Sequence, residues 1–80
     1  MARALLGTQD MGLAIALLCK GFHLVDLKQS DNTARITFRF QWQDDLHETA
    51  QAYWNGSLQV DAKHYWQESR TLKARLYGME

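Results

Sequence analysis

The clearest pattern in the chain is a strict alternation of apolar and polar side chains over residues 34–43. The apolar positions are Ala34, Ile36, Phe38, Phe40 and Trp42, and the polar positions are Arg35, Thr37, Arg39, Gln41 and Gln43. A period of two predicts an antiparallel strand with one buried face and one wet face. Residues 22–28 predict a second strand, and the turn-forming residues 29–33 between them predict a hairpin.

A first helix is predicted over residues 10–20. Thr8 or Asp10 can cap it, and Gly21 can end it in a left-handed conformation. Its apolar stripe is joined by Ile15 and Ala16, so the helix is apolar almost all round. We therefore expect it to be covered on more than one side, by the domain core plus either the lead-in residues 1–8 or a second subunit.

Two further helices are predicted in the second half of the chain. Asp45 and Glu48 have the spacing of a reciprocal capping pair for a helix that runs to about Trp54 and ends at Asn55-Gly56. Residues 57–60 read as a short extended piece. Asp61 then caps a last helix through Tyr77, stopped by Gly78; its predicted core stripe is Tyr65, Ser69, Leu72 and Leu76.

This order predicts a small α+β fold with a single domain over residues 1–80. The predicted architecture is helix–β-hairpin–helix–short strand–helix, with the helices packed on one face of an antiparallel sheet. Residues 1–8 are expected to be a flexible lead-in and residues 10–78 the core. Because a two-stranded sheet is marginal alone, we expect a third strand from Leu58–Val60 or from another copy of the chain.

Composition narrows the range of functions. The chain has 80 residues, 46% of them hydrophobic, so it is expected to fold. Nine basic and nine acidic residues cancel, so any electrostatic partner must be read from a local patch. The single Cys19 excludes an internal disulfide and favours the cytoplasm. The apolar run 12–19 is too short to span a membrane and lacks a cleavage site, so no membrane partner is expected.

No pattern of catalytic or metal-binding residues is present. Cys19, His23, His47 and His64 lack the spacing of zinc ligands, so no metal and no cofactor is predicted. The carboxylates Asp44, Asp45 and Glu48 are explained by helix capping. Phosphate-loop and nucleophile motifs are absent, so we predict no catalytic residues and no enzyme. A hydrolase that uses Asp44, Asp45 and His47 is a further possible class of function, but no known sequence motif supports it.

The last helix offers a candidate binding surface beside its core stripe. At about 100° per residue, one face gathers Lys63, Trp66, Arg70, Lys73 and Tyr77. Three cations and two aromatics can clamp phosphates and stack on bases or guanidinium groups. Arg35 and Arg39 on the wet strand face could extend this patch. The alternative is structural: Trp66 packs at the core edge, Tyr77 covers the helix end and the cations offset the helix dipole.

Several short motifs together resemble a known family. They are Ala14-x-x-Leu17, Gly21-Phe22-x-Leu24, Phe38-x-Phe40, Tyr53-Trp54-Asn55-Gly56, Val60-Asp61 and Leu72-Lys73-x-Arg75-x-Tyr77. Over residues 11–77 the chain resembles a family of short bacterial and phage proteins of unknown function. The resemblance carries no activity with it. It implies a prokaryotic or phage setting, an accessory role, and shared structural work for Trp54, Gly56, Val60, Lys73 and Tyr77.

The resulting functional prediction is a small non-catalytic protein-interaction or regulatory module. Its partner is expected to be another protein or a second copy of the chain, within a bacterial or phage system. The alternative is a nucleic-acid-binding accessory protein that uses the basic and aromatic face of the last helix.

Overall fold

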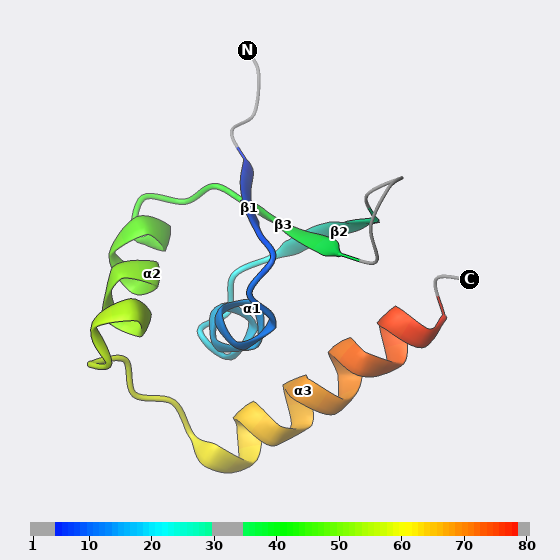
Figure 1. The fold of residues 1–80 in the computed structure, drawn as a ribbon. Helices are drawn as coiled ribbons and strands as arrows, with labels where there is room; N and C mark the ends of the chain where they lie inside the picture. Colours follow the sequence, from blue (N-terminus) through cyan, green and yellow to red (C-terminus); the bar gives the residue numbers. More distant parts are fainter. Residues whose placement is uncertain (1–4, 30–34, 79–80) are drawn as a thin grey trace.

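The computed structural model describes residues 5–29 and 35–78, which form an α+β fold of three helices and a three-stranded antiparallel sheet (Figure 1). The elements in chain order are β1 (Leu5–Thr8), α1 (Met11–Cys19), β2 (Leu24–Gln29), β3 (Ile36–Gln41), α2 (Leu46–Asn55) and α3 (Ala62–Tyr77). The predicted α+β class is therefore confirmed. The predicted order is only partly right, because a strand precedes the first helix.

The strand predicted from alternation lies in the middle of the sheet, whose order is β1-β3-β2. Phe38 is paired with Thr8 on one side and Leu27 on the other, and Phe40 is paired with Leu6 and Leu24. Both phenylalanines are buried, and together with Leu24 of β2 they form the sheet's buried contribution to the core. The prediction extended the strand too far: Trp42 lies beyond β3 and is 41% exposed. Ala34 lies outside the described residues.

The predictions for the third strand and for the lead-in were wrong. Leu58–Val60 pairs with no strand within residues 5–29 and 35–78, and residues 5–8 instead form β1, which pairs with the edge of β3 that β2 does not occupy. A central strand must satisfy backbone groups on both of its edges, and β1 does this for the second edge. Four residues are too few to show a period, which is why the pattern did not reveal them. Residues 1–4 of the predicted lead-in lie outside the described residues.

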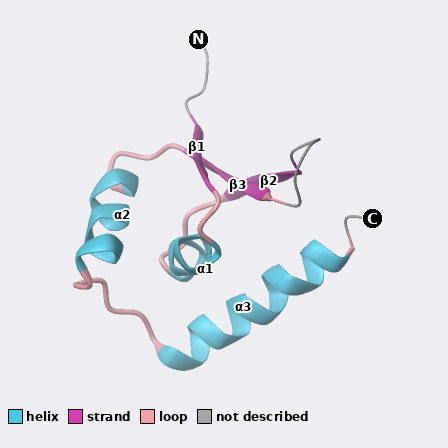
Figure 2. Ribbon diagram, viewed as in Figure 1, coloured by secondary structure: helices cyan, strands magenta, loops and turns pink. Residues whose placement is uncertain are grey.

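Helix α1 lies at the centre of the fold, between the sheet and the other two helices (Figures 1 and 2). Five consecutive residues, Leu13 to Leu17, are buried. Such a run leaves no side of the helix for water, so α1 needs cover all round. The prediction that it is covered on more than one side is confirmed, and the cover comes from β1, the rest of the sheet, α2 and α3 of the same chain.

Two of the three predicted N-caps are confirmed. The Asp10 carboxylate accepts from the Leu13 N–H at 3.2 Å, and the Asp61 carboxylate accepts from the His64 N–H at 2.9 Å. The capping pair of Asp45 and Glu48 was predicted wrongly, because the Asp45 side chain makes no cap hydrogen bond. Asp45 has near-helical angles (φ −93°, ψ 3°) rather than the extended geometry that turns a cap side chain back onto the helix.

The two glycines that end α2 and α3 differ in their backbone requirements. Gly56 has φ +77°, the left-handed region that side chains with a Cβ rarely adopt. Gly78 has φ −83°, which any residue adopts, and a Cβ there would make only ordinary contacts. Both glycines end a helix, but only the stop at Gly56 depends on glycine itself.

We predict that Gly56→Ala lowers the free energy of unfolding by about 1 kcal/mol or more, because alanine must adopt a left-handed backbone. The matched variant Gly78→Ala should stay within about 0.5 kcal/mol of the wild type. Urea unfolding of both variants measures the difference, and equal effects would contradict the special role of Gly56.

Candidate functional site

The predicted binding face of α3 is exposed to solvent. Trp66 is 60% exposed and Tyr77 is 77% exposed, so the alternative that Trp66 packs at the core edge is wrong. The predicted core stripe runs alongside this face, with Ser69 and Leu72 buried. We call the exposed set the basic aromatic face; its members are Lys63, Trp66, Arg70, Lys73 and Tyr77.

The basic aromatic face has a local positive charge although the chain is neutral. Its three cations form no ion pair with any residue of the described ranges 5–29 and 35–78. The one acidic residue within α3, Glu68, instead lies 3.2 Å from the ring of His64, one helical turn away. The cations are therefore available to carboxylates or phosphates of a partner.

The predicted extension through the strand arginines does not hold for Arg39. Its Nε and Nη2 atoms donate to the two Asp26 carboxylate oxygens at 2.6 Å and 2.5 Å. This bidentate pair joins β3 to β2 on the sheet face opposite Phe38 and Phe40, while α3 packs against α1. Arg39 is thus already neutralised, and it lies on another element. Arg35, also predicted as a binding residue, is exposed just before β3.

Other candidate residues are not brought together. In the part of the chain that the structure describes, no three His, Cys, Asp or Glu side chains lie close enough to hold a metal ion. Cys19 is partly buried at the end of α1, and burial raises the pKa of its thiol, which makes it a poorer nucleophile. Among the same described residues, no helix has the length and apolar character needed to cross a membrane.

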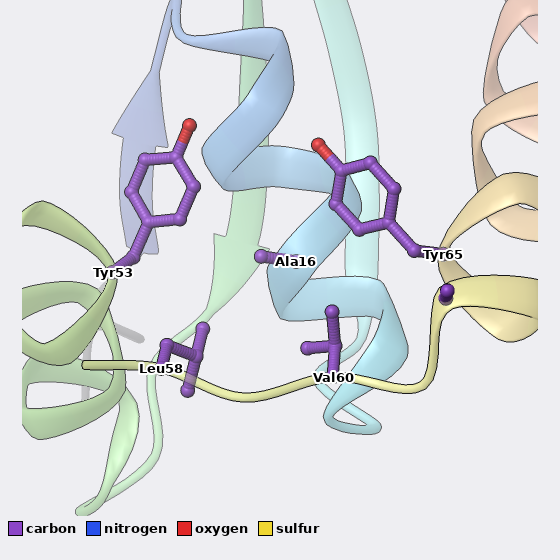
Figure 3. A pocket seen from close by; sticks show the side chains of 6 residues that line it. Ala16, Tyr53, Leu58, Val60 and Tyr65 are labelled. Atoms are coloured by element: carbon purple, nitrogen blue, oxygen red, sulfur yellow. The ribbon is translucent and has the colours of Figure 1, made fainter. Parts of the chain in front are cut away.

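A pocket that the sequence analysis missed lies between the three helices (Figure 3). Its volume is about 400 Å³, and its lining comes from α1, α2, α3 and the extended connector between α2 and α3. The rings of Tyr53 and Tyr65 lie on either side of Ala16, and both hydroxyls point away from the two connector side chains (Figure 3). The residues that line the pocket are Ala16, Tyr53, Leu58, Val60, Ala62 and Tyr65.

Gly12 lies beside the hydroxyl groups of both tyrosines. The Tyr65 hydroxyl donates to the Gly12 carbonyl at 3.4 Å. A Cβ at Gly12 would lie 2.4 Å from the Tyr53 hydroxyl oxygen, so only glycine lets that ring approach α1 so closely. Burial, followed by the nearby Asp10 carboxylate, raises the pKa of Tyr53 and keeps its hydroxyl protonated. The sequence carries one signal of this close contact, which is a glycine, Gly12, in the first turn of an otherwise apolar helix.

The first prediction from this site concerns Gly12 and Tyr53. Gly12→Ala should destabilise the protein by about 1 kcal/mol or more, because the new methyl group displaces the tyrosine. In a Tyr53→Phe background the nearest ring atom is 3.5 Å away. The same change should then be neutral or stabilising by up to about 1 kcal/mol, from helix propensity. Urea unfolding of the wild type, the two single variants and the double variant measures the effect of Gly12→Ala on stability in each background. An equal effect with and without the Tyr53 hydroxyl would contradict the contact.

The second prediction concerns the pH dependence of the strand ion pair. The hydrogen bond from Arg39 lowers the pKa of Asp26 below its ordinary 3.8. A lowered carboxyl pKa in the folded state contributes stability above 3.8 that is lost as the pH falls through the lowered value. Asp26→Asn should therefore unfold at lower urea than the wild type at neutral pH, and the difference should vanish in strong acid. A difference that is independent of pH would exclude the charge as its cause.

Comparison with known proteins gives a family but no activity. No curated protein and no solved structure matches the chain. One family profile matches residues 3–78, which includes β1 as well as the segment on which the resemblance rested. Its description is a domain of unknown function. Since the match covers nearly the whole chain, the protein belongs to the DUF5659 family.

Proposed function

We propose that the chain is a small non-catalytic protein-interaction module that binds its partner through the basic aromatic face. The exposure of Trp66 and Tyr77 carries this proposal. Large aromatic side chains gain free energy when a partner removes them from water, and Trp, Tyr and Arg supply most of the binding energy of protein interfaces. Arg70 lies one helical turn from Trp66, so the two can act as a single anchor.

The charges on this face favour a partner with an acidic surface. Lys63, Arg70 and Lys73 are exposed and form no ion pair within the described residues. A matching row of carboxylates would steer association and exclude basic competitors. A second copy of the chain could supply such a row, because residues 44–61 contain Asp44, Asp45, Glu48 and Asp61 and no Lys or Arg. A homodimer is therefore one form that this interaction can take.

Nucleic acid is the second candidate partner, favoured by the combination of unpaired cations with two exposed aromatic rings. Such a face can neutralise phosphates and stack on bases of a single strand. The acidic segment 44–61 argues against it, since it would repel the same phosphate backbone. A protein partner can complement both segments at once, which is why we place it first.

The setting that we propose is accessory or regulatory work in the cytoplasm of a bacterium or in a phage-infected cell. The single Cys19, which cannot form an internal disulfide, suits a reducing compartment. The resemblance of the chain to short bacterial and phage proteins supports the prokaryotic setting. No catalytic step is part of this function.

The test is affinity capture with the wild-type chain followed by matched variants of α3. We expect one stoichiometric protein, or a dimer by light scattering, that is lost with the double variant Arg70→Glu/Lys73→Glu. Trp66→Ala should weaken binding by about 30-fold, the loss typical of an interface hot spot. Arg75→Glu, a single charge reversal at an exposed position outside the basic aromatic face, should bind like the wild type, whereas the single reversal Arg70→Glu should weaken binding.

Titration with fluorescent single-stranded and duplex oligonucleotides separates the two candidates. Binding through three phosphate contacts would give a slope of log K against log salt of roughly −2 for a single strand. If that slope appears and is abolished by Arg70→Glu/Lys73→Glu, the partner is nucleic acid. A strict monomer that captures no protein and binds no oligonucleotide would refute both functions.

A further inference from the structure

The pocket between the helices is separate from the basic aromatic face and has a different chemical character. Ala16 of α1, itself 2% exposed, forms its floor, and Leu58 and Val60 of the connector lie at one end (Figure 3). Its volume of about 400 Å³ falls within the range of pockets that hold small molecules. Apart from the two tyrosine hydroxyls, the side chains that line it are hydrocarbon. Its occupant must therefore be largely apolar.

The two tyrosine rings favour a flat occupant. Tyr53 from α2 and Tyr65 from α3 approach from opposite sides of Ala16, and the small alanine leaves open the space between them (Figure 3). An aromatic ring placed there can contact both tyrosines in the offset or edge-to-face arrangements that aromatic pairs prefer. The ring would also cover the Ala16 methyl group.

The two tyrosine hydroxyls make the other end of the pocket polar, and the Asp10 carboxylate lies near the Tyr53 hydroxyl without itself lining the pocket. Tyr65 donates its hydroxyl proton to the Gly12 carbonyl, which leaves its oxygen free to accept. The Tyr53 hydroxyl has no hydrogen-bond partner among the described residues. The Asp10 carboxylate is close to it: both groups lie within 3.3 Å of the position that a Cβ at Gly12 would take.

This polar end discriminates between cations and anions. The Asp10 carboxylate attracts an ammonium group and repels a carboxylate, and the tyrosine hydroxyl oxygens can accept hydrogen bonds from the ammonium group. The amino end of α1 would by itself favour an anion, but Asp10 already accepts the hydrogen bond of Leu13 N and offsets that dipole. A positively charged or donor-bearing group fits this end better than an acidic one.

We propose that this pocket binds a small aromatic amine, with its ring between Tyr53 and Tyr65 over Ala16 and its ammonium group beside the Tyr53 hydroxyl and Asp10. The assignment does not depend on the function of the α3 face. It gives the chain a ligand-binding site in addition to its partner-binding surface.

The test is a pair of NMR titrations of the full chain, one with phenethylamine and one with phenylacetate at the same ionic strength. The two probes share a phenyl ring and are similar in size but carry opposite charges. We expect phenethylamine to shift the amide signals of Ala16, Val60 and Tyr65 and to bind at least about tenfold more tightly than phenylacetate. Equal affinities, or shifts confined to α3 residues outside the pocket, would overturn the assignment.

Two variants locate the site. Ala62→Trp places an indole at the pocket mouth and should abolish phenethylamine binding, whereas Ala74→Trp, at an exposed position farther along the same helix, should not. Asp10→Asn keeps a good helix cap but removes the charge, so the preference for phenethylamine over phenylacetate should shrink by about tenfold. Undiminished binding to Ala62→Trp, or an unchanged preference in Asp10→Asn, would overturn the proposal.

Discussion

The enclosure of α1 is the constraint on which the rest of the structure depends. A helix with five consecutive buried residues cannot lie on a surface, so the chain must surround it. The sheet covers one side through Phe38 and Phe40, and α2 and α3 cover others (Figure 1). In a chain of 80 residues, covering α1 uses most of the buried apolar side chains, so few remain to form a second hydrophobic core.

The same enclosure explains why the two candidate sites lie where they do. To reach α1 from opposite sides, α2 and α3 are joined by an extended connector rather than a tight turn, and the pocket occupies the space that this connector crosses (Figure 3). Because α3 needs only one stripe, centred on Ser69 and Leu72, to cover α1, the rest of its circumference remains in water. The basic aromatic face is the part of that surface where tryptophan and cations coincide.

Much of the fold could be predicted from the sequence because its strongest signals are local. The alternation around Phe38 and the caps Asp10 and Asp61 depend on residues near each other in the chain, and the structure confirms them. The sequence could not show that residues 5–8 pair with β3 and that Leu58–Val60 does not. A short extended segment joins a sheet only if the fold brings it to an unpaired strand edge, and that depends on the tertiary structure. Helical spacing places Trp66 and Arg70 on one side of α3. It gives the direction in which a side chain leaves the helix but not how deeply that side chain is buried, so only the structure shows that Trp66 is exposed.

The pocket shows the limit of sequence reasoning more clearly. Tyr53 and Tyr65 both look like core positions, and nothing in the chain indicates that they lie on either side of Ala16. Of the residues that the family resemblance singled out, Gly56 ends α2 and Val60 lines the pocket, whereas Trp54, Lys73 and Tyr77 are exposed. The residues on which the resemblance rests therefore include both folding requirements and surface positions.

The pairing of β1 with β3 also bears on how the chain matures during translation. β1 and α1 leave the ribosome before the elements that cover them: β1 must wait for residues 38–41, and α1 for α3. Until those elements are made, an almost wholly apolar helix is therefore exposed to solvent. Without α3, the side of α1 that this helix covers would expose apolar side chains to water, so a chain that ends before α3 should associate through them rather than form a smaller folded domain.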